Sequence, residues 1–148
     1  NPKRLFIENN DAHMVINEGK CTGKVIGGNL SIFTQLKGTE FMPKFDDAVL
    51  FLEDCDELPE FIDGFLQSII LLPNFHKVKG VILGRTNKKT NLSNDILYKM
   101  IKQKKELKNI PVIANVNFGH TTPIFTFPIG GKIEIDTSND IKIKFLKN

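Results

Sequence analysis

Three short, mostly apolar runs divide the middle of the chain. They cover residues 48–52, 78–83 and 110–116, and polar residues, glycine or proline bound each of them. Continuous apolar runs of this length are typical of strands that are covered on both faces, as in a parallel sheet. We therefore expect three buried strands at these positions.

The segments between these runs have apolar residues at helical spacing. After the turn at Pro59, apolar residues from Phe61 to Ile70 recur on one helical face. Ser93 can cap a second helix, basic and amphipathic, that extends to about residue 107. The resulting order of strand, helix, strand, helix, strand makes neighbouring strands parallel, with right-handed crossovers.

Weaker patterns come before this unit. Residues 1–10 are compatible with a linker or an entering strand, while residues 14–16 and 21–26 predict a hairpin with turn residues between them. Residues 30–36 have helical spacing, and Gly38 can end that helix in a left-handed conformation.

Short alternating runs follow the unit, at residues 124–128, 132–136 and 141–145. They predict a small antiparallel β layer. The whole pattern predicts a single α/β domain over residues 1–148, with a small, partly parallel sheet, two main helices and this short antiparallel layer.

Composition narrows the class of protein. The chain of 148 residues is 41% hydrophobic and 25% charged, which is ordinary for a soluble globular protein. The net charge is only +3, and the lysines at residues 99–108 are better explained by a solvated helix face than by a nucleic-acid surface. No apolar run approaches the roughly 18 residues of a membrane span, and no signal peptide opens the chain. We expect a cytoplasmic protein without nucleic-acid or membrane partners.

The two cysteines, Cys21 and Cys55, provide neither a disulfide framework nor a metal-ligand spacing. They fit a reducing cytoplasm, although a single bridge between them stays open. We therefore expect no metal and no cofactor. The first residue is Asn1 rather than Met, which suggests a piece of a longer protein, although a trimmed start would look the same.

Two residues at predicted strand ends are the candidates for chemistry. Glu53 follows the first apolar run directly, and His120 follows the third. The carboxyl ends of parallel strands meet at one edge of a sheet, where ligands bind, so these side chains should lie close together. A carboxylate that accepts from one imidazole nitrogen leaves the other to act as a general base, which is two thirds of a triad. The plainer alternative for Glu53 is a solvated strand end.

A nucleophile for such a triad is missing from the sequence. Cys55 lies two residues after Glu53, but a small, half-buried cysteine is inert more often than catalytic. The hydroxyl candidates qualify only by residue type, because none lies in the G-x-S-x-G pattern of a nucleophile elbow. They are Ser31, Thr34, Thr121 and Thr122.

A glycine pair, Gly27 and Gly28, precedes the short predicted helix. Without side chains, this backbone could admit a substrate, and a tight turn without any ligand is the alternative.

Six ordered sequence blocks resemble the serine peptidase family of murein LD-carboxypeptidases and microcin C immunity peptidases. The blocks are GGNLS at 27–31, LKGTEFMP at 36–43, VLFLEDCDE at 49–57, VKGVILGR at 78–85, NFGH at 117–120 and FPIG at 127–130. The resemblance implies a C-terminal domain, a swivelling β/β/α unit. It also implies that the nucleophilic serine belongs to an N-terminal domain absent from this sequence, and that the protein forms a homodimer.

Carried over residue by residue, Glu53 matches the triad acid of the family and His120 matches the triad base. The GGN block would line the substrate pocket through Gly28 and Asn29. The chain departs from the family at Gly64, where the family often has arginine, and at Thr86, where the family has phenylalanine after Gly-Arg. Both departures concern substrate contact or packing and leave the triad positions untouched.

The blocks around residues 15–30 and 120–130 are closer to the microcin-immunity branch of the family than to the murein-recycling branch. The resemblance implies two substrate classes. The first branch hydrolyses the amide between an acidic amino acid and a modified nucleotide, and the second releases the terminal D-alanine of a murein tetrapeptide.

Two hypotheses follow from different classes of protein. In the first, the chain is the acid-and-base half of a serine peptidase and is inactive alone. In the second, it is a complete binding module that uses the same sheet edge and catalyses nothing. A further domain upstream in the native gene, with a serine at a strand-to-helix turn, would decide for the first.

Overall fold

Four parallel strands form the centre of one continuous sheet. They are β3 (Lys20–Asn29), β4 (Ala48–Glu53), β5 (Gly80–Gly84) and β6 (Val112–Val116), which pair side by side in that order. The computed structural model describes residues 6–10 and 12–147, and the fold is given for these. The three predicted buried strands are confirmed as β4, β5 and β6, and their carboxyl ends lie on one edge of the sheet.

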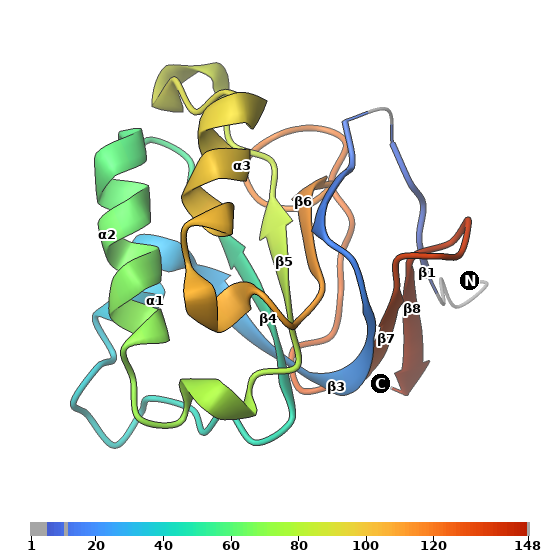
Figure 1. Ribbon diagram of the computed structural model, residues 1–148, viewed down its shortest axis with the longest axis horizontal. Coiled ribbons are helices and arrows are strands. Elements are labelled where there is room, and N and C mark those ends of the chain that lie inside the picture. Colours follow the sequence, from blue (N-terminus) through green and yellow to red (C-terminus); the bar gives the residue numbers. More distant parts are fainter. Residues whose placement is uncertain (1–5, 11, 148) are drawn as a thin grey trace.

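Helices connect these strands. In Figure 1, α1 (Leu30–Thr34), α2 (Pro59–Ile70) and α3 (Asn94–Lys102) gather on one side of the central strands. Ser93 caps α3 as predicted, because its hydroxyl accepts a hydrogen bond from the backbone N–H of Ile96 at 3.2 Å. Single turns of 3-10 helix complete the connections: η1 (Phe75–Lys77), η2 (Lys88–Thr90) and η3 (Lys105–Leu107). No helix among the described residues is long and apolar enough to span a bilayer.

Strand β4 lies between the two halves of the core. Its six residues are all buried. Val49 and Phe51 pack in the cluster formed with the antiparallel strands, whereas Leu50 and Leu52 pack in the cluster formed with the helices. Successive side chains of a strand point to opposite faces, so one continuous apolar run supplies both clusters. The described part of the chain thus covers β4 on both faces with its own side chains.

Antiparallel strands extend the sheet at both ends. Next to β3 lie β7 (Lys132–Asp136), β8 (Ile143–Lys147) and β1 (Phe6–Ile7), and next to β6 lies β2 (Met14–Asn17). Strand β3 is shared along its length, since its first half pairs with β7 and its second half with β4. The predicted α/β class is confirmed, and the antiparallel layer proves to be part of the same curled, eight-stranded sheet.

The predicted hairpin is wrong. Strand β2 pairs with β6, whereas β3 pairs with β4 and β7. The turn between them is real, but the backbone N–H of Gly19 donates to the hydroxyl of Thr137 at 2.9 Å, which ties the turn to the end of β7. The turn therefore carries the chain from the edge strand β2 to the interior strand β3, which lies between β7 and β4, instead of reversing it beside itself.

Several elements also differ from the prediction in their extent. The first helix ends at Thr34, although Gly38 has the predicted left-handed backbone, with φ of +79°. Helix α3 ends at Lys102, and η3 continues to residue 107. Residues 124–128 form no strand. Residues 6–7 form the entering strand, and residues 1–5 of that predicted segment lie outside the described residues.

We expect Leu52→Ala to lower the free energy of unfolding by about 2–5 kcal/mol, since it removes a fully buried side chain from the helix-side cluster. Urea unfolding of the 148-residue chain measures this. The matched control is Leu146→Ala on β8, where the leucine is 52% exposed and the loss should stay below about 1 kcal/mol. Equal losses for the two variants would contradict the assignment of β4 as the central strand.

Candidate active site

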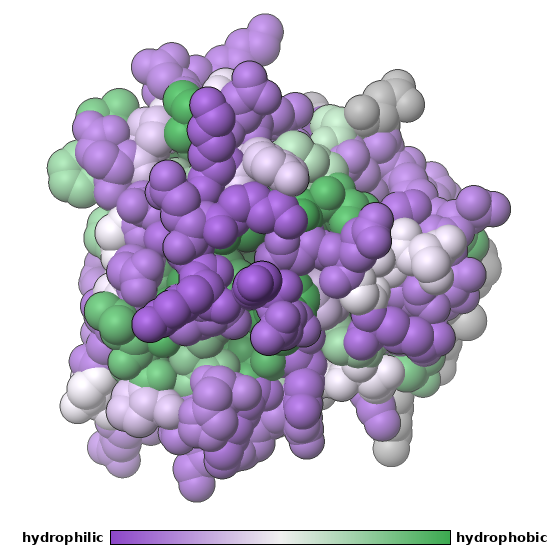
Figure 2. Space-filling model, in the orientation of Figure 1, coloured by the Kyte–Doolittle hydropathy of each residue, from purple (hydrophilic) through white to green (hydrophobic). Residues whose placement is uncertain are grey.

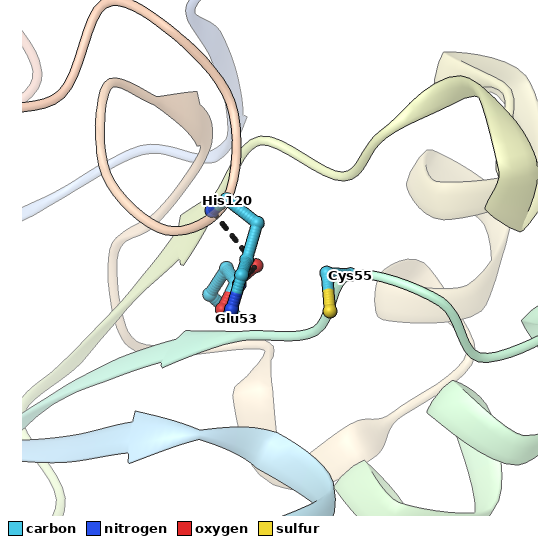
Figure 3. Close-up of side chains that lie close together, drawn as sticks. All are labelled: Glu53, Cys55 and His120. Atoms are coloured by element: carbon cyan, nitrogen blue, oxygen red, sulfur yellow. Dashed lines mark hydrogen bonds and ion pairs between the residues drawn. The ribbon is translucent and has the colours of Figure 1, made fainter.

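Glu53 is the last residue of β4, and its side chain is only 4% exposed. A carboxylate buried in this way is stable only when it is hydrogen-bonded. One of its oxygens, Oε1, lies 2.8 Å from Nδ1 of His120 and accepts from the backbone N–H of His120 at 3.3 Å (Figure 3). The side chain of Glu53 is therefore buried and hydrogen-bonded to His120, and the alternative of a solvated strand end is wrong.

The loop after β6 brings His120 to this carboxylate. The ring of Phe118 anchors the loop, because it packs against Phe51 of β4 and against Phe127 at centroid distances of 5.3 and 5.2 Å. Gly119 follows with φ of +98°, and a Cβ on it would lie 2.2 Å from Cγ of Glu53. Only a glycine can let the backbone pass so close to the carboxylate.

A second glycine encloses the carboxylate from the side of β5. A Cβ on Gly84 would lie 2.9 Å from Cβ and Cγ of Glu53 and 2.9 Å from the carbonyl oxygen of Phe118. The guanidinium of the next residue, Arg85, donates to the carbonyl oxygens of Thr122 and Pro123. The ends of β4, β5 and β6 thus hold Glu53 and the His120 loop in a fixed arrangement.

The ring of His120 is 58% exposed, so only one of its edges is engaged by the protein. An ionised carboxylate can only accept, so Nδ1 carries the proton in this pair, and Nε2 of the neutral ring keeps its lone pair. The hydrogen bond to Glu53 and then the charge of Glu53 raise the pKa of His120 above its ordinary value, with Asp56 and Asp54 adding to the rise. An exposed, oriented imidazole of raised basicity can act as a general base.

The acidic residues after Glu53 have structural partners. Asp54 is buried and accepts from the backbone N–H groups of Ser31 and Cys55, both at 2.9 Å, which ties the start of α1 to this turn. Asp56 accepts from the side-chain amide of Asn87 at 3.0 Å.

Both cysteines are free thiols. Partial burial and then the charge of Asp56 raise the pKa of Cys55, which keeps its thiol protonated. A protonated thiol is a poor nucleophile, so this geometry favours the inert interpretation of Cys55. The ligand atoms of Glu53, Cys55 and His120 nevertheless lie within 4.8 Å of one another, so these three side chains could hold a metal ion.

The predicted pocket residues Gly28 and Asn29 lie at the end of β3, where Asn29 is the backbone neighbour of Glu53. The side-chain oxygen of Asn29 caps α1, because it accepts from the backbone N–H of Ile32 at 3.1 Å. A Cβ on Gly28 would meet nothing within 4 Å, so the backbone there faces open space. Gly27 is different, since its Cβ would lie 1.9 Å from the carbonyl oxygen of Phe51. One glycine of the pair is therefore required by strand packing, and the other leaves room for a ligand.

Other groups make hydrogen bonds elsewhere: Ser31 donates to Asn29, Thr34 donates to the carbonyl of Ser31, and the two remaining histidines have partners of their own. In the described part of the chain, no serine or threonine hydroxyl is hydrogen-bonded to His120. Nδ1 of His13 lies near the side-chain oxygen of Asn9, and burial lowers the pKa of His13 to about 4. Nδ1 of His76 lies near the carbonyl oxygen of Pro73. Of the side chains that the sequence singles out, the structure thus joins Glu53 and His120 by a hydrogen bond, and no candidate hydroxyl is bonded to His120 within residues 6–10 and 12–147.

Residues 22–135 match the sequence family described as the LD-carboxypeptidase C-terminal domain. The chain belongs to this family. The sequence blocks that contain Glu53 and His120 resemble the same C-terminal domain, and the matched residues include both.

Individual relatives agree with the family. "Putative carboxypeptidase YocD" of Bacillus subtilis is 47% identical over 135 residues, which cover 90% of this chain and 41% of YocD. The microcin C7 self-immunity protein MccF of Escherichia coli is 34% identical over 140 residues, covering 93% of this chain and 40% of MccF. The chain therefore spans about 40% of the length of these curated relatives.

Solved structures share the fold of this LD-carboxypeptidase C-terminal domain. The crystal structure of an MccF-like protein from Bacillus anthracis matches with a TM-score of 0.88 and 37% identity, covering 99% of this chain and 50% of that one. MccF in complex with aspartyl sulfamoyl adenosine matches with a TM-score of 0.75 and 28% identity, covering 95% and 42% of the two chains.

We expect Glu53→Gln to lower the pKa of His120, because the neutral amide removes the interactions that raise it. NMR titration of the imidazole protons measures this, and His13 serves as the internal control, since Glu53 is not among the causes of its shift. Because the pKa of His120 is raised in the folded state, the pair stabilises the fold fully below about pH 6.5, and this contribution is lost as the pH rises through the folded pKa. An unchanged pKa in Glu53→Gln would show that the hydrogen bond does not form in solution.

Gly119→Ala should separate Glu53 from His120, because the added methyl group occupies the space of the carboxylate. We expect a lower pKa of His120 in the same titration and a lower melting temperature. Gly64→Ala is the matched control: it lies inside α2, its Cβ would meet nothing within 4 Å, and the change should stabilise the protein by about 0.5–1 kcal/mol. If the pKa of His120 in Gly119→Ala equals that in the parent protein, the close approach of Gly119 to Glu53 is not needed for the pair to form.

Proposed function

We propose that this chain supplies the acid and the base of a serine peptidase whose nucleophile lies on an N-terminal domain of the same protein. The observation that carries the proposal is the hydrogen bond of 2.8 Å between His120 Nδ1 and the buried carboxylate of Glu53, with most of the imidazole exposed. The fact that the chain spans about 40% of the curated relatives supports a further domain.

In the proposed mechanism, His120 is the general base. Nε2 takes the proton of the serine hydroxyl while the serine oxygen attacks the carbonyl carbon of the substrate amide. His120 then gives this proton to the leaving amine, and an acyl-enzyme forms. Water, deprotonated by the same nitrogen, attacks the acyl group and releases the serine. Glu53 keeps the imidazole in the required tautomer and stabilises its positive charge in both steps.

Gly28 and Asn29 are the proposed substrate contacts. The open backbone at Gly28 leaves room for a substrate chain beside Glu53, and the capping bond of Asn29 to α1 holds that side chain in place. No metal or cofactor is needed for this acyl transfer.

The substrate class that we propose is the amide between an acidic amino acid and a nucleotide, as in microcin C. Support comes from the match to MccF, a microcin C7 self-immunity protein that has been solved with aspartyl sulfamoyl adenosine. The L,D bond of a murein tetrapeptide is the second substrate to be tested, because the family name refers to LD-carboxypeptidases. A cytoplasmic homodimer is part of the same proposal.

The full-length gene product should hydrolyse one of these substrates, and the 148-residue chain alone should not. We expect His120→Ala and Glu53→Ala in the full-length protein to lower kcat by on the order of 10³-fold or more, as in other triads. His76→Ala is the control, because this histidine lies apart from the pair, on η1. Release of the amine product, followed by chromatography, measures turnover.

Two results would overturn the proposal. Turnover by the 148-residue chain that is abolished by Cys55→Ala would make the protein a cysteine hydrolase. Failure of the full-length protein on both substrates, together with binding of either one, would favour the non-catalytic binding module.

A further inference from the structure

Cys55 has a place in the site that the peptidase mechanism does not use. It follows the turn fixed by Asp54, and Figure 3 shows its side chain beside the pair of Glu53 and His120. The sulfur of Cys55, a carboxylate oxygen of Glu53 and a ring nitrogen of His120 all lie within 4.8 Å of one another. From this constellation we propose that the chain binds Zn²⁺ through Glu53, Cys55 and His120, and that bound zinc blocks the acid–base pair.

The ligand types suit zinc better than other common cations. Thiolate, imidazole and carboxylate are the side chains that bind Zn²⁺, and three protein ligands leave a fourth position for water. Mg²⁺ and Ca²⁺ prefer oxygen ligands throughout, so the thiol argues against them. On binding, the proton of the thiol leaves to the solvent, the sulfur donates an electron pair to the metal, and nothing is oxidised or reduced.

The distances require only a small adjustment. With metal–ligand bonds of about 2.0–2.3 Å, the ligand atoms of a tetrahedral zinc site lie about 3.3–3.6 Å apart. The longest separation here, at most 4.8 Å, must therefore close by roughly 1 Å. The hydrogen bonds between Glu53 and His120 already hold these two ligands together, and Cys55 is only half-buried, so rotation of its side chain can bring the sulfur toward them.

The charges around the three ligands also favour a cation. Asp54 and Asp56 flank Cys55 in the sequence, and the carboxylate of Asp56 lies 3.6 Å from the sulfur. Of the nearby cations, Arg85 donates to the carbonyl oxygens of Thr122 and Pro123, and Lys89 acts on Asp56 only through its charge. Negative charge thus surrounds the ligands and attracts a divalent ion.

Zinc and catalysis would exclude each other. A metal on Nε2 of His120 takes the lone pair that must accept the proton of the serine, and a metal on Nδ1 replaces the hydrogen bond to Glu53. Either geometry removes the general base. This inhibitory consequence rests on the proposed function, whereas metal binding itself does not.

The test starts with the 148-residue chain, kept reduced and titrated with Zn²⁺ by calorimetry. We expect one ion per chain, and an affinity lowered by about tenfold or more in Cys55→Ser and in His120→Ala. Cys21→Ser is the matched control, because it removes the other thiol, which lies on β3, and it should bind as the parent does. Circular dichroism checks that each variant is folded.

Co²⁺ supplies a readout that a purely structural role would not change. A cobalt–thiolate bond absorbs in the near ultraviolet, so the parent and Cys21→Ser should show this band and Cys55→Ser should lack it. The proposal is overturned if no stoichiometric ion binds, or if the band survives in Cys55→Ser, or if it disappears in Cys21→Ser.

The full-length protein then tests the consequence. Zn²⁺ should inhibit turnover, and Cys55→Ser should raise the concentration needed for half inhibition by about tenfold or more. Metal binding without any turnover in the full-length protein would refute the peptidase proposal and leave the zinc site standing. Turnover that zinc does not affect, in a protein that binds zinc at these residues, would refute the blocking step.

Discussion

The burial of one carboxylate at the end of β4 determines the geometry of the candidate site. A charge in this position must be satisfied by hydrogen bonds, and the loop after β6 provides them from a single residue, through both the backbone and the ring of His120. The same two bonds that make the buried charge tolerable also fix the orientation of the imidazole. The stability of the buried charge and the orientation of the imidazole therefore depend on the same contact, so replacing Glu53 or His120 should affect both.

The parallel topology explains how residues far apart in sequence reach this contact. Glu53 and His120 are separated by 67 positions, yet Glu53 is the last residue of β4 and His120 lies in the loop that follows β6 in the same sheet. Crossover helices return the chain to the same side of the sheet before every parallel strand, so strand ends collect on one edge. The aromatic contacts of Phe118 then set the height of the loop above that edge. Membership of the LD-carboxypeptidase C-terminal domain family fits this arrangement, since the matched residues 22–135 include both side chains.

Much of this could be predicted from the sequence, and the reasons for the failures are physical. The continuous apolar run at residues 48–52 predicted a strand covered on both faces, because such a run can be recognised from neighbouring residues alone. The closeness of Glu53 and His120 followed from the parallel order of the strands. The hairpin prediction failed because strand pairing depends on partners that are distant in sequence. Strand β2 pairs with β6, about 100 residues further along the chain, and not with the next strand, β3. The roles of Gly84 and Gly119 were also invisible, since close approach to Glu53 exists only in the folded chain. For the same reason, the sequence did not predict that the sulfur of Cys55 lies close to both Glu53 and His120.

The tight contact at Gly27 has a consequence for the folding of the sheet. Because the carbonyl of Phe51 occupies the space of a Cβ at this position, β3 can align with β4 only where a glycine stands opposite it. A slip of β3 by one residue in one direction would place Ile26 there and is sterically forbidden. A slip in the other direction would place Gly28 opposite Phe51. It would also exchange the two faces of β3, so that Val25 would point to the helix side and Ile26 to the side of the antiparallel strands. The close approach at Gly27 therefore favours the one register in which Asn29 lies opposite Glu53.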